Sequence, residues 1–225
     1  MKTSRWIGRW MTLAAATVLT GWVAQAAPQN ANFSASAVKG TVSVEGTSGK
    51  KPLNVGDKLN TGDTVTTAAS STADLAVSVG GKQVCVLHIW ESSSYTILDT
   101  TVDEGADGIV LVAKGKVGSG SVSGESYSSP GSKLTIEAGG SQNDIKGSFL
   151  IRADGSIYSY SGQVSVTAGG RTVRVSSGQY FNPAAAAVLP HTLPKPVFVA
   201  GTTSTETTSQ TQVVSPTQPS SGGGN

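Results

Sequence analysis

The feature that most constrains the fold is a repeated pattern of short apolar runs separated by glycine turns. Runs rich in Val, Leu and Ile recur roughly every 8 to 12 residues over 38–181, which is the spacing of strands in an all-β domain. Asp154-Gly155 and Gly169-Gly170 stand between such runs and are typical of β-hairpin turns. No amphipathic helix of useful length precedes residue 183. We therefore predict an all-β fold.

The apolar positions within these runs follow the period of a strand. Val42 and Val44 alternate with polar residues, a pattern that indicates a strand with one buried face. Residues 84–89 are almost continuously apolar, as expected of a strand that is buried on both faces. The alternation therefore predicts a core lined by Val, Leu and Ile.

The first 26 residues have the three-part pattern of a secretory signal peptide. Three cations lie within the first nine residues, residues 10–24 are largely apolar and uncharged, and Ala24-Gln25-Ala26 forms a small-residue cleavage site. An uncleaved membrane anchor is the alternative, but the apolar stretch is shorter than the roughly 20 residues of a spanning helix. We predict that residues 1–26 are removed, which leaves a periplasmic or secreted protein without a stable membrane span.

Charge and cysteine content exclude several classes of protein. Outside the first nine residues, thirteen Lys and Arg stand against fourteen Asp and Glu. No basic stripe remains to neutralise a phosphate backbone, so we predict no binding to nucleic acid. Cys85 is the single cysteine and lies in an apolar run. It cannot form an internal disulfide, and we interpret it as a small buried hydrophobe.

Changes in composition divide the chain into segments. Residues 27–37 are rich in Ala, Asn and Ser and are expected to be a loose lead-in, and residues 38–181 form the all-β domain. Prolines stiffen a linker over 182–200, and residues 201–225 consist mainly of Thr, Ser, Gln and Gly. Such a tail cannot bury enough apolar area to offset the entropy of ordering, so we predict that it is disordered.

A series of strand and turn motifs follows the domain in a fixed order. Gly56-Asp57 and Gly62-Asp63 are typical of tight turns at which glycine supplies a positive φ. The matching runs are Val38-x-Gly40-x-Val42-x-Val44, Leu53-x-x-Gly56-Asp57-x-Leu59-x-x-Gly62-Asp63-x-Val65-x-Thr67, Ser71-x-Ala73-x-Leu75-x-Val77, Gly147-Ser148-Phe149-x-Ile151, Ser161-Gly162-Gln163-Val164-x-Val166 and Val173-x-Val175-x-x-Gly178-Gln179. In this order they resemble the FecR domain family, all-β extracytoplasmic domains best known in regulators of iron-siderophore uptake.

This resemblance implies a β-solenoid-like or rolled double-sheet domain, and it specifies a scaffold rather than a chemistry. The family's regulators also carry a cytoplasmic anti-sigma segment and a C-terminal receptor-docking domain. Here about nine residues precede the apolar run and a low-complexity tail closes the sequence, so we expect both parts to be absent. The residues that the family motif implies as turns are Gly40, Gly56, Asp57, Gly62, Asp63, Gly147, Gly162 and Gly178.

Few residues in the sequence are candidates for a metal site or a catalytic site. Cys85, His88 and His191 are the only soft metal ligands, and three positions on a strand place Cys85 and His88 on opposite faces. An acidic stretch over 99–108 is expected to be a solvated loop, with calcium as a weak alternative. Its candidate ligands are Asp99, Asp103, Glu104 and Asp107. We predict no cofactor and no catalytic set.

Tyr158 and Tyr160 share one face of a predicted strand by the period of two. An exposed Tyr pair can stack on a partner or on sugar rings. We therefore expect a non-enzymatic, exported interaction or sensory module that binds a protein partner in the periplasm or cell envelope. A cell-wall or glycan-binding structural module is the alternative. An enzyme acting on an envelope polysaccharide is disfavoured, because no catalytic set is evident.

Overall fold

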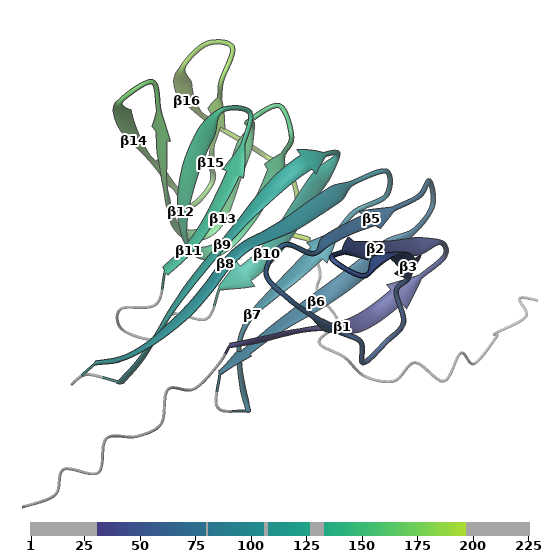
Figure 1. Ribbon diagram of the computed structural model, residues 1–225. Coiled ribbons are helices and arrows are strands. Elements are labelled where there is room, and N and C mark those ends of the chain that lie inside the picture. Colours follow the sequence, from purple (N-terminus) through teal and green to yellow (C-terminus); the bar gives the residue numbers. More distant parts are fainter. Residues whose placement is uncertain (1–30, 80, 106–107, 127–132, 197–225) are drawn as a thin grey trace, which may run out of the picture.

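The computed structural model describes residues 31–79, 81–105, 108–126 and 133–196, and these form strands and turns without a helix (Figure 1). The all-β prediction is therefore confirmed, and within the described residues no helix is long and apolar enough to cross a membrane. The strands are β1 (Asn32–Lys39), β2 (Val42–Gly46), β3 (Gly49–Pro52), β4 (Lys58–Leu59), β5 (Thr64–Thr67), β6 (Thr72–Val79), β7 (Lys82–Ile89), β8 (Ser94–Gly105), β9 (Gly108–Ser119), β10 (Ser121–Ser126), β11 (Lys133–Ala138), β12 (Ser141–Arg152), β13 (Ile157–Ala168), β14 (Arg171–Ser176), β15 (Gln179–Asn182) and β16 (Ala187–Pro190).

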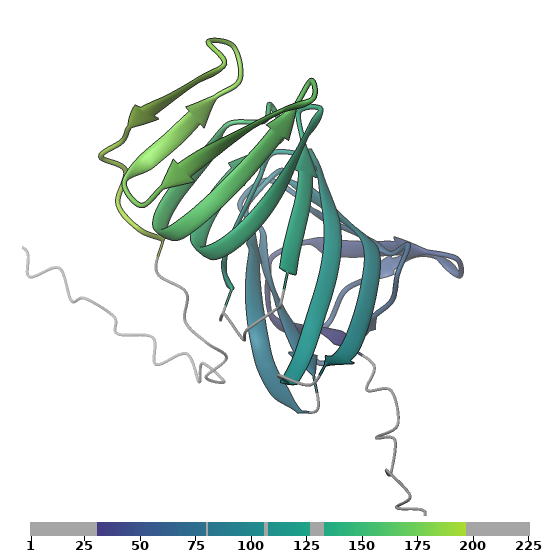
Figure 2. The same ribbon diagram turned by 90° about the vertical axis from the view of Figure 1, so that its left-hand side faces the viewer.

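The sixteen strands belong to one continuous sheet that is rolled about its core (Figures 1 and 2). The main path runs β3-β2-β5-β8-β9-β11-β12-β10-β7-β6-β1-β4, and β13 joins β12 to β14 and β15. Among these pairs β9 and β11 run parallel and the others antiparallel. The solenoid-like alternative is therefore wrong, because coils of a solenoid would stack as parallel strands. The sheet is also single rather than double.

One side of the rolled sheet carries the core, and we call it the inner face; the opposite side is the outer face. In β13, Ile157 and Ser159 are fully buried on the inner face, whereas Tyr158 and Tyr160 are half-buried on the outer face. The largest fully buried side chains are Tyr95, Phe33, Phe149, Leu75, Leu87, Ile89, Ile97, Ile136, Ile145, Ile151, Ile157 and Val65. The alternation in the sequence is thus the alternation between these two faces.

Two strands in the middle of the sheet each change neighbours halfway along. The first half of β12 pairs with β11 and the second half with β10. The first half of β13 pairs with β15 and the second half with β14. Gly147 of β12 and Gly162 of β13 lie directly opposite each other at this change, with φ of 110° and 72°.

Gly147 and Gly162 are therefore not turns, and that prediction is wrong. Both lie inside long strands, next to a shift of register between Ser148 and Phe149. A Cβ on Gly147 would collide with the carbonyl oxygen of Ser161, and one on Gly162 with that of Lys146. Glycine is required at both positions because the backbones of β12 and β13 approach each other closely at a bulge.

The two Gly-Asp motifs do form turns, and the predicted positive φ is confirmed. Gly56 has φ of 89° and Gly62 of 93°. The Asn54 amide donates to Asp57 Oδ2 at 2.9 Å, and the Asn60 amide makes the same bond to Asp63 at 2.8 Å. Each carboxylate therefore closes its own turn. Of the other motif glycines, Gly40 and Gly178 also lie between strands with positive φ.

The domain extends beyond the predicted boundaries at both ends. Part of the expected lead-in over 27–37 is strand β1, because Phe33 and Ala35 alternate into the core and pair with β6. The expected linker over 182–200 includes the end of β15 and all of β16, which extend the sheet to Pro190. The predicted signal peptide over 1–26 and the tail over 201–225 lie outside the described residues.

Candidate functional site

Aromatic side chains gather on the outer face where β12, β13, β15 and β16 lie side by side. Leu150, Tyr158, Tyr180 and Leu189 are direct partners across these four strands. Direct partners in adjacent antiparallel strands project to the same face. The neighbouring Ile151, Ile157 and Phe181 are buried on the inner face. The register of the sheet thus gathers apolar side chains from distant parts of the chain.

Four rings and a guanidinium form what we call the aromatic cluster: Tyr158, Tyr160, Tyr180, His191 and Arg152. The Tyr158 and Tyr180 rings stack with centroids 5.1 Å apart and an interplanar angle of 10°. His191 meets Tyr158 and Tyr160 edge-on at 5.4 and 5.1 Å. Arg152 Cζ lies 5.3 Å from the centre of the Tyr158 ring. The rings brace one another in a fixed arrangement.

Hydrogen bonds hold His191 in place over β13. Its amide donates to the Gly178 carbonyl at 2.9 Å, and Nε2 lies 3.1 Å from the Ser159 carbonyl oxygen. Because a carbonyl oxygen only accepts, Nε2 carries the proton in this arrangement. Nδ1 is buried and has no hydrogen-bond partner. Burial and the neighbouring Tyr158 raise the pKa of the Tyr160 phenol, and Arg152 opposes that shift.

The same cross-strand row continues from Leu150 through Ser123 and His88 to Asp74. His88 Nδ1 pairs with an Asp74 carboxylate oxygen. These are the residue types of a catalytic triad, but Ser123 is fully buried. Its hydroxyl oxygen accepts a hydrogen bond from Trp90 Nε1 at 2.8 Å. This row therefore presents no accessible nucleophile, and it is best explained as a packed polar ladder.

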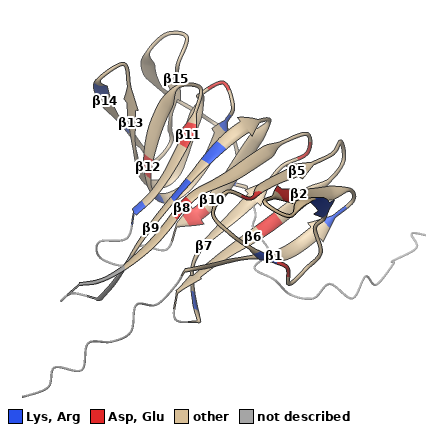
Figure 3. Cartoon of the chain, viewed as in Figure 1, with Lys and Arg blue, Asp and Glu red and all other residues tan. Residues whose placement is uncertain are grey.

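A second outer region, over β11 to β14, is polar. Figure 3 marks charged residues along β9, β11 and β12. Thr135, Asp144, Ser165 and Arg174 form one cross-strand row. Asp144 accepts a hydrogen bond from Thr135 Oγ1 at 2.7 Å and pairs with Lys133 at 3.0 Å.

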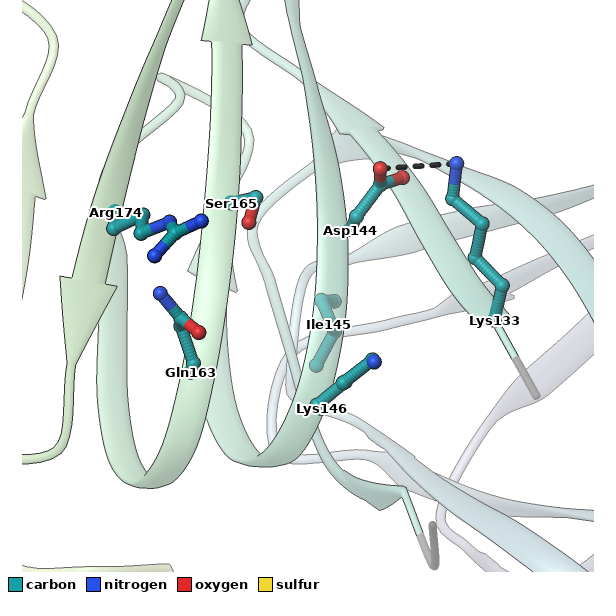
Figure 4. Close-up of a pocket in the computed structure, with 7 residues that line it drawn as sticks. All are labelled: Lys133, Asp144, Ile145, Lys146, Gln163, Ser165 and Arg174. Atoms are coloured by element: carbon teal, nitrogen blue, oxygen red, sulfur yellow. Dashed lines mark ion pairs between the residues drawn. The ribbon is translucent and has the colours of Figure 1, made fainter. Parts of the chain in front are cut away.

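A shallow hollow of about 390 Å³ lies over this polar region (Figure 4). Lys146, Gln163 and Arg174 line it together with the Lys133–Asp144 pair. Within the described ranges neither Lys146 nor Arg174 makes an ion pair. Such a surface can hold polar or anionic groups weakly, but it offers no aromatic platform.

The acidic stretch is not the loop that was predicted. Asp99, Asp103 and Glu104 belong to β8, because the β-branched residues between them continue the strand. Asp99 lies opposite Lys114 and accepts from Thr101 at 3.3 Å. The side chains of Asp103 and Glu104 and the whole of Asp107 lie outside the described parts. Among the side chains that the structure describes, no three His, Cys, Asp or Glu gather as a metal site would require.

Cys85 and His88 project to opposite faces, as their spacing predicts. Cys85 is buried in the core, whereas His88 lies on the outer face beside Trp90, with ring centroids 4.5 Å apart. Burial, with a smaller effect from Glu125, raises the pKa of the Cys85 thiol to about 12. A protonated, enclosed thiol is a structural side chain rather than a nucleophile.

The sequence identified two members of the aromatic cluster, Tyr158 and Tyr160, and missed the other three. Tyr180 and Arg152 join through strand register, and His191 joins because the chain turns back after β16. Neither relation has a local sequence signal. The prolines around His191 are the one hint in the sequence, and they predict a linker rather than a site.

Known proteins offer little guidance for this chain. No protein-family model matches it, and no curated protein is similar to it. Two crystal structures of a protein from Parabacteroides distasonis, provisionally described as an anti-sigma factor, match with TM-scores of 0.43 and 0.42. Each match has 12% sequence identity and covers 57% of this chain and 58% of the other. Similarity at this level carries no argument about family or function.

Proposed function

We propose that this protein is an exported, non-enzymatic FecR-like module that binds a protein partner in the periplasm or cell envelope through the aromatic cluster. The observation that carries the proposal is the braced group of half-buried rings on the outer face, with Tyr158 stacked on Tyr180 and Arg152 over Tyr158. Tyr and Arg are enriched at the centres of protein interfaces.

The arrangement of these groups suits a protein partner. Each Tyr offers a large contact area with only two rotatable side-chain bonds, so little entropy is lost when a partner binds. Stacking reduces that loss further, because the rings are already held at 5.1 Å. Arg152 is exposed at the margin and can pair with a carboxylate of the partner. The cluster thus combines a rigid apolar centre with a charged rim.

Export and family membership rest on the sequence. The signal-peptide pattern over 1–26 supports secretion. The ordered Gly-Asp and Gly-Gln motifs support a FecR-like scaffold, and the paired turns at Gly56 and Gly62 are compatible with it.

Glycan binding is the alternative function. A sugar ring stacks on an open aromatic face. Here Tyr158 already has Tyr180 parallel to it and Arg152 over its ring. A glycan would have to displace these neighbours, which favours the protein partner.

Crosslinking from native cell envelopes tests the proposal, with residues 27–225 as bait. Tyr158→Ala and Tyr180→Ala each remove half of the stack, and Arg174→Ala is a matched control in the polar region. We expect a specific protein that is recovered with the native chain and with Arg174→Ala but is lost with either Tyr variant. Recovery of wall glycan alone would favour the alternative. A protein recovered equally with all four baits would refute the aromatic cluster as the binding site.

A further inference from the structure

The last described residues do not leave the domain after β16. They turn back over the outer face, and in Figure 1 the yellow-green end of the described chain comes to lie beside β10. We call residues 191–196 the strap. At one end His191 is fixed to β13 and the aromatic cluster. At the other end Lys195 Nζ pairs with Glu125 Oε1 of β10 at 3.1 Å.

The strap crosses β12 between these two ends. β12 pairs with β13 on one side and with β10 on the other, so the strap spans roughly 10 Å of sheet. Four residues of extended chain reach about 13 Å, which suffices. Pro190, Pro194 and Pro196 stand in and beside the strap. Proline favours an extended backbone that has few donors to satisfy.

Two outer-face side chains that flank Glu125 are buried. Glu125 has Ser148 as its direct partner on β12 and Val86 on β7, so all three project to one face. Ser148 is fully buried and its hydroxyl has no hydrogen-bond partner, and Val86 is also buried. A buried polar group without a partner marks a site that a ligand's own donor could satisfy.

We propose that the strap is a removable occupant of this surface, and that the partner inserts an extended, proline-containing segment with a basic residue in the same place. The inference rests on the proposed function and names the class of partner. Extended proline-rich segments dock on surfaces lined by aromatic side chains, which is the arrangement that the strap makes with Tyr158 and Tyr160. Glu125 forms an ion pair with the basic residue of the partner's segment, as it does with Lys195 of the strap.

The strap's anchors are few enough for such an exchange. Two hydrogen bonds and two edge-on ring contacts hold His191. The Lys195–Glu125 pair is 48% and 31% exposed, and pairs so exposed contribute little. The attached strap competes at an effective concentration near the millimolar range. The apparent affinity for a partner is therefore the intrinsic affinity multiplied by the fraction of time that the strap is detached.

The test is the binding of a labelled peptide with the sequence of residues 187–198, measured by fluorescence anisotropy against the mature full-length chain. Lys195→Glu sets two carboxylates against each other and releases the strap. We expect this variant to bind the peptide about two- to fivefold more tightly than the native chain. In the double variant Glu125→Lys with Lys195→Glu the pair re-forms, and a peptide that carries the same Lys195→Glu change is expected to bind this variant with the affinity of the native peptide for the native chain.

Two controls keep the result specific. Lys133→Glu breaks the pair with Asp144, which is 47% and 36% exposed and lies in the polar region, and it is expected to leave peptide binding unchanged. Tyr158→Ala is expected to abolish the gain produced by Lys195→Glu. Equal affinity of the native chain and Lys195→Glu, or an equal gain from Lys133→Glu, would overturn the proposal.

Failure of this inference can be told apart from failure of the proposed function. If a Tyr158-dependent envelope protein is recovered but Lys195→Glu does not tighten peptide binding, the cluster is the binding site and the strap is a fixed part of it. If Lys195→Glu instead makes the chain dimerise in sedimentation experiments, the exchanged segment belongs to a second copy, and the assignment to a different partner is wrong.

Discussion

The outer face has two halves that share the strands β12 and β13 but differ in chemistry. Before the Gly147–Gly162 pair, β13 projects Tyr158 and Tyr160 outward; after it, β13 projects Gln163 and Ser165. The aromatic half carries the strap and the polar half carries the shallow hollow. One pair of strands can therefore present two different surfaces when its neighbouring strands change partway along.

A shift of one residue in β13 makes this possible. Ser148 pairs with Ser161, but the next residue, Phe149, pairs with Ser159, so Tyr160 is the extra residue of a bulge. Before the bulge Ile157 and Ser159 point inward, and after it Val164 and Val166 do. Without that shift the two valines would face solvent. The bulge thus keeps the core continuous while the outer surface changes.

The largest expected effect comes from breaking the boundary between the halves. Gly162→Val places a side chain against the Lys146 carbonyl, in a backbone with φ of 72°. We expect the free energy of unfolding to fall by about 3 to 5 kcal/mol, from strain and overpacking together. Chemical denaturation of the purified variant measures it.

Gly62→Val is the matched control for backbone strain alone. Its φ is 93°, but a Cβ there would meet nothing within 4 Å. We expect a loss of about 1 to 2 kcal/mol. Equal losses at Gly62 and Gly162 would show that the close approach of β12 and β13 is not what requires glycine at the boundary.

The sequence predicted the elements far better than it predicted this boundary. Alternating Val and Leu locate the strands, and Asp154-Gly155 forms the expected hairpin turn, in which Asp154 Oδ1 accepts from the Ser156 amide at 2.8 Å. A glycine motif, however, does not distinguish a turn from a bulge. Both need a positive φ or a close approach, and only the pairing partner of Gly147 settles which one it is.

Two buried ionisable groups of the core, one thiol and one phenol, make the stability depend on alkaline pH. Cys85 in β7 and Tyr95 in β8 are both fully enclosed in the core. Burial raises the pKa of Cys85 from 9.0 to about 12, and it raises the pKa of Tyr95 as well. Above pH 9 the unfolded thiol loses its proton first, so stability is complete below that pH and falls as pH rises toward 12.

We expect the native chain to lose up to about 1.4 kcal/mol per pH unit between pH 9 and 10 from Cys85 alone. Cys85→Val is expected to be flat over that window and to decline only above pH 10, where unfolded Tyr ionises. Denaturant titrations at half-unit steps of pH measure both slopes. A native chain as flat as Cys85→Val would mean that the thiol is accessible in the folded state.

A smaller effect is expected from the Tyr95 hydroxyl. It is buried and has no hydrogen-bond partner, so Tyr95→Phe removes an uncompensated polar group. We expect a gain of about 1 kcal/mol in the free energy of unfolding, together with a weaker decline above pH 10, where the Tyr160 phenol still contributes. Tyr158→Phe, on the half-buried outer face, is the control and should change stability little. Destabilisation by Tyr95→Phe would reveal a partner for the hydroxyl.

The candidate site was less predictable than the core because its members meet through register and not through spacing. Tyr158 and Tyr160 share a face by the local period, but Tyr180 reaches them only because β15 pairs with the first half of β13. His191 lies among prolines, which weaken any signal for regular structure. A local pattern can place a side chain on a face; it cannot say which distant strand lies beside it.

The smallest expected effects come from two matched ion pairs, one in each half. Lys133→Ala and Lys195→Ala each remove the cation of a pair at 3.0 or 3.1 Å, and both should lower the free energy of unfolding by less than about 1 kcal/mol. Hydrogen exchange should nevertheless separate them. Lys195→Ala should speed exchange within residues 191–196 alone, whereas Lys133→Ala should leave those residues unchanged. A loss of several kcal/mol from Lys195→Ala would make the strap part of the cooperative core, because a displaceable segment cannot contribute that much to global stability.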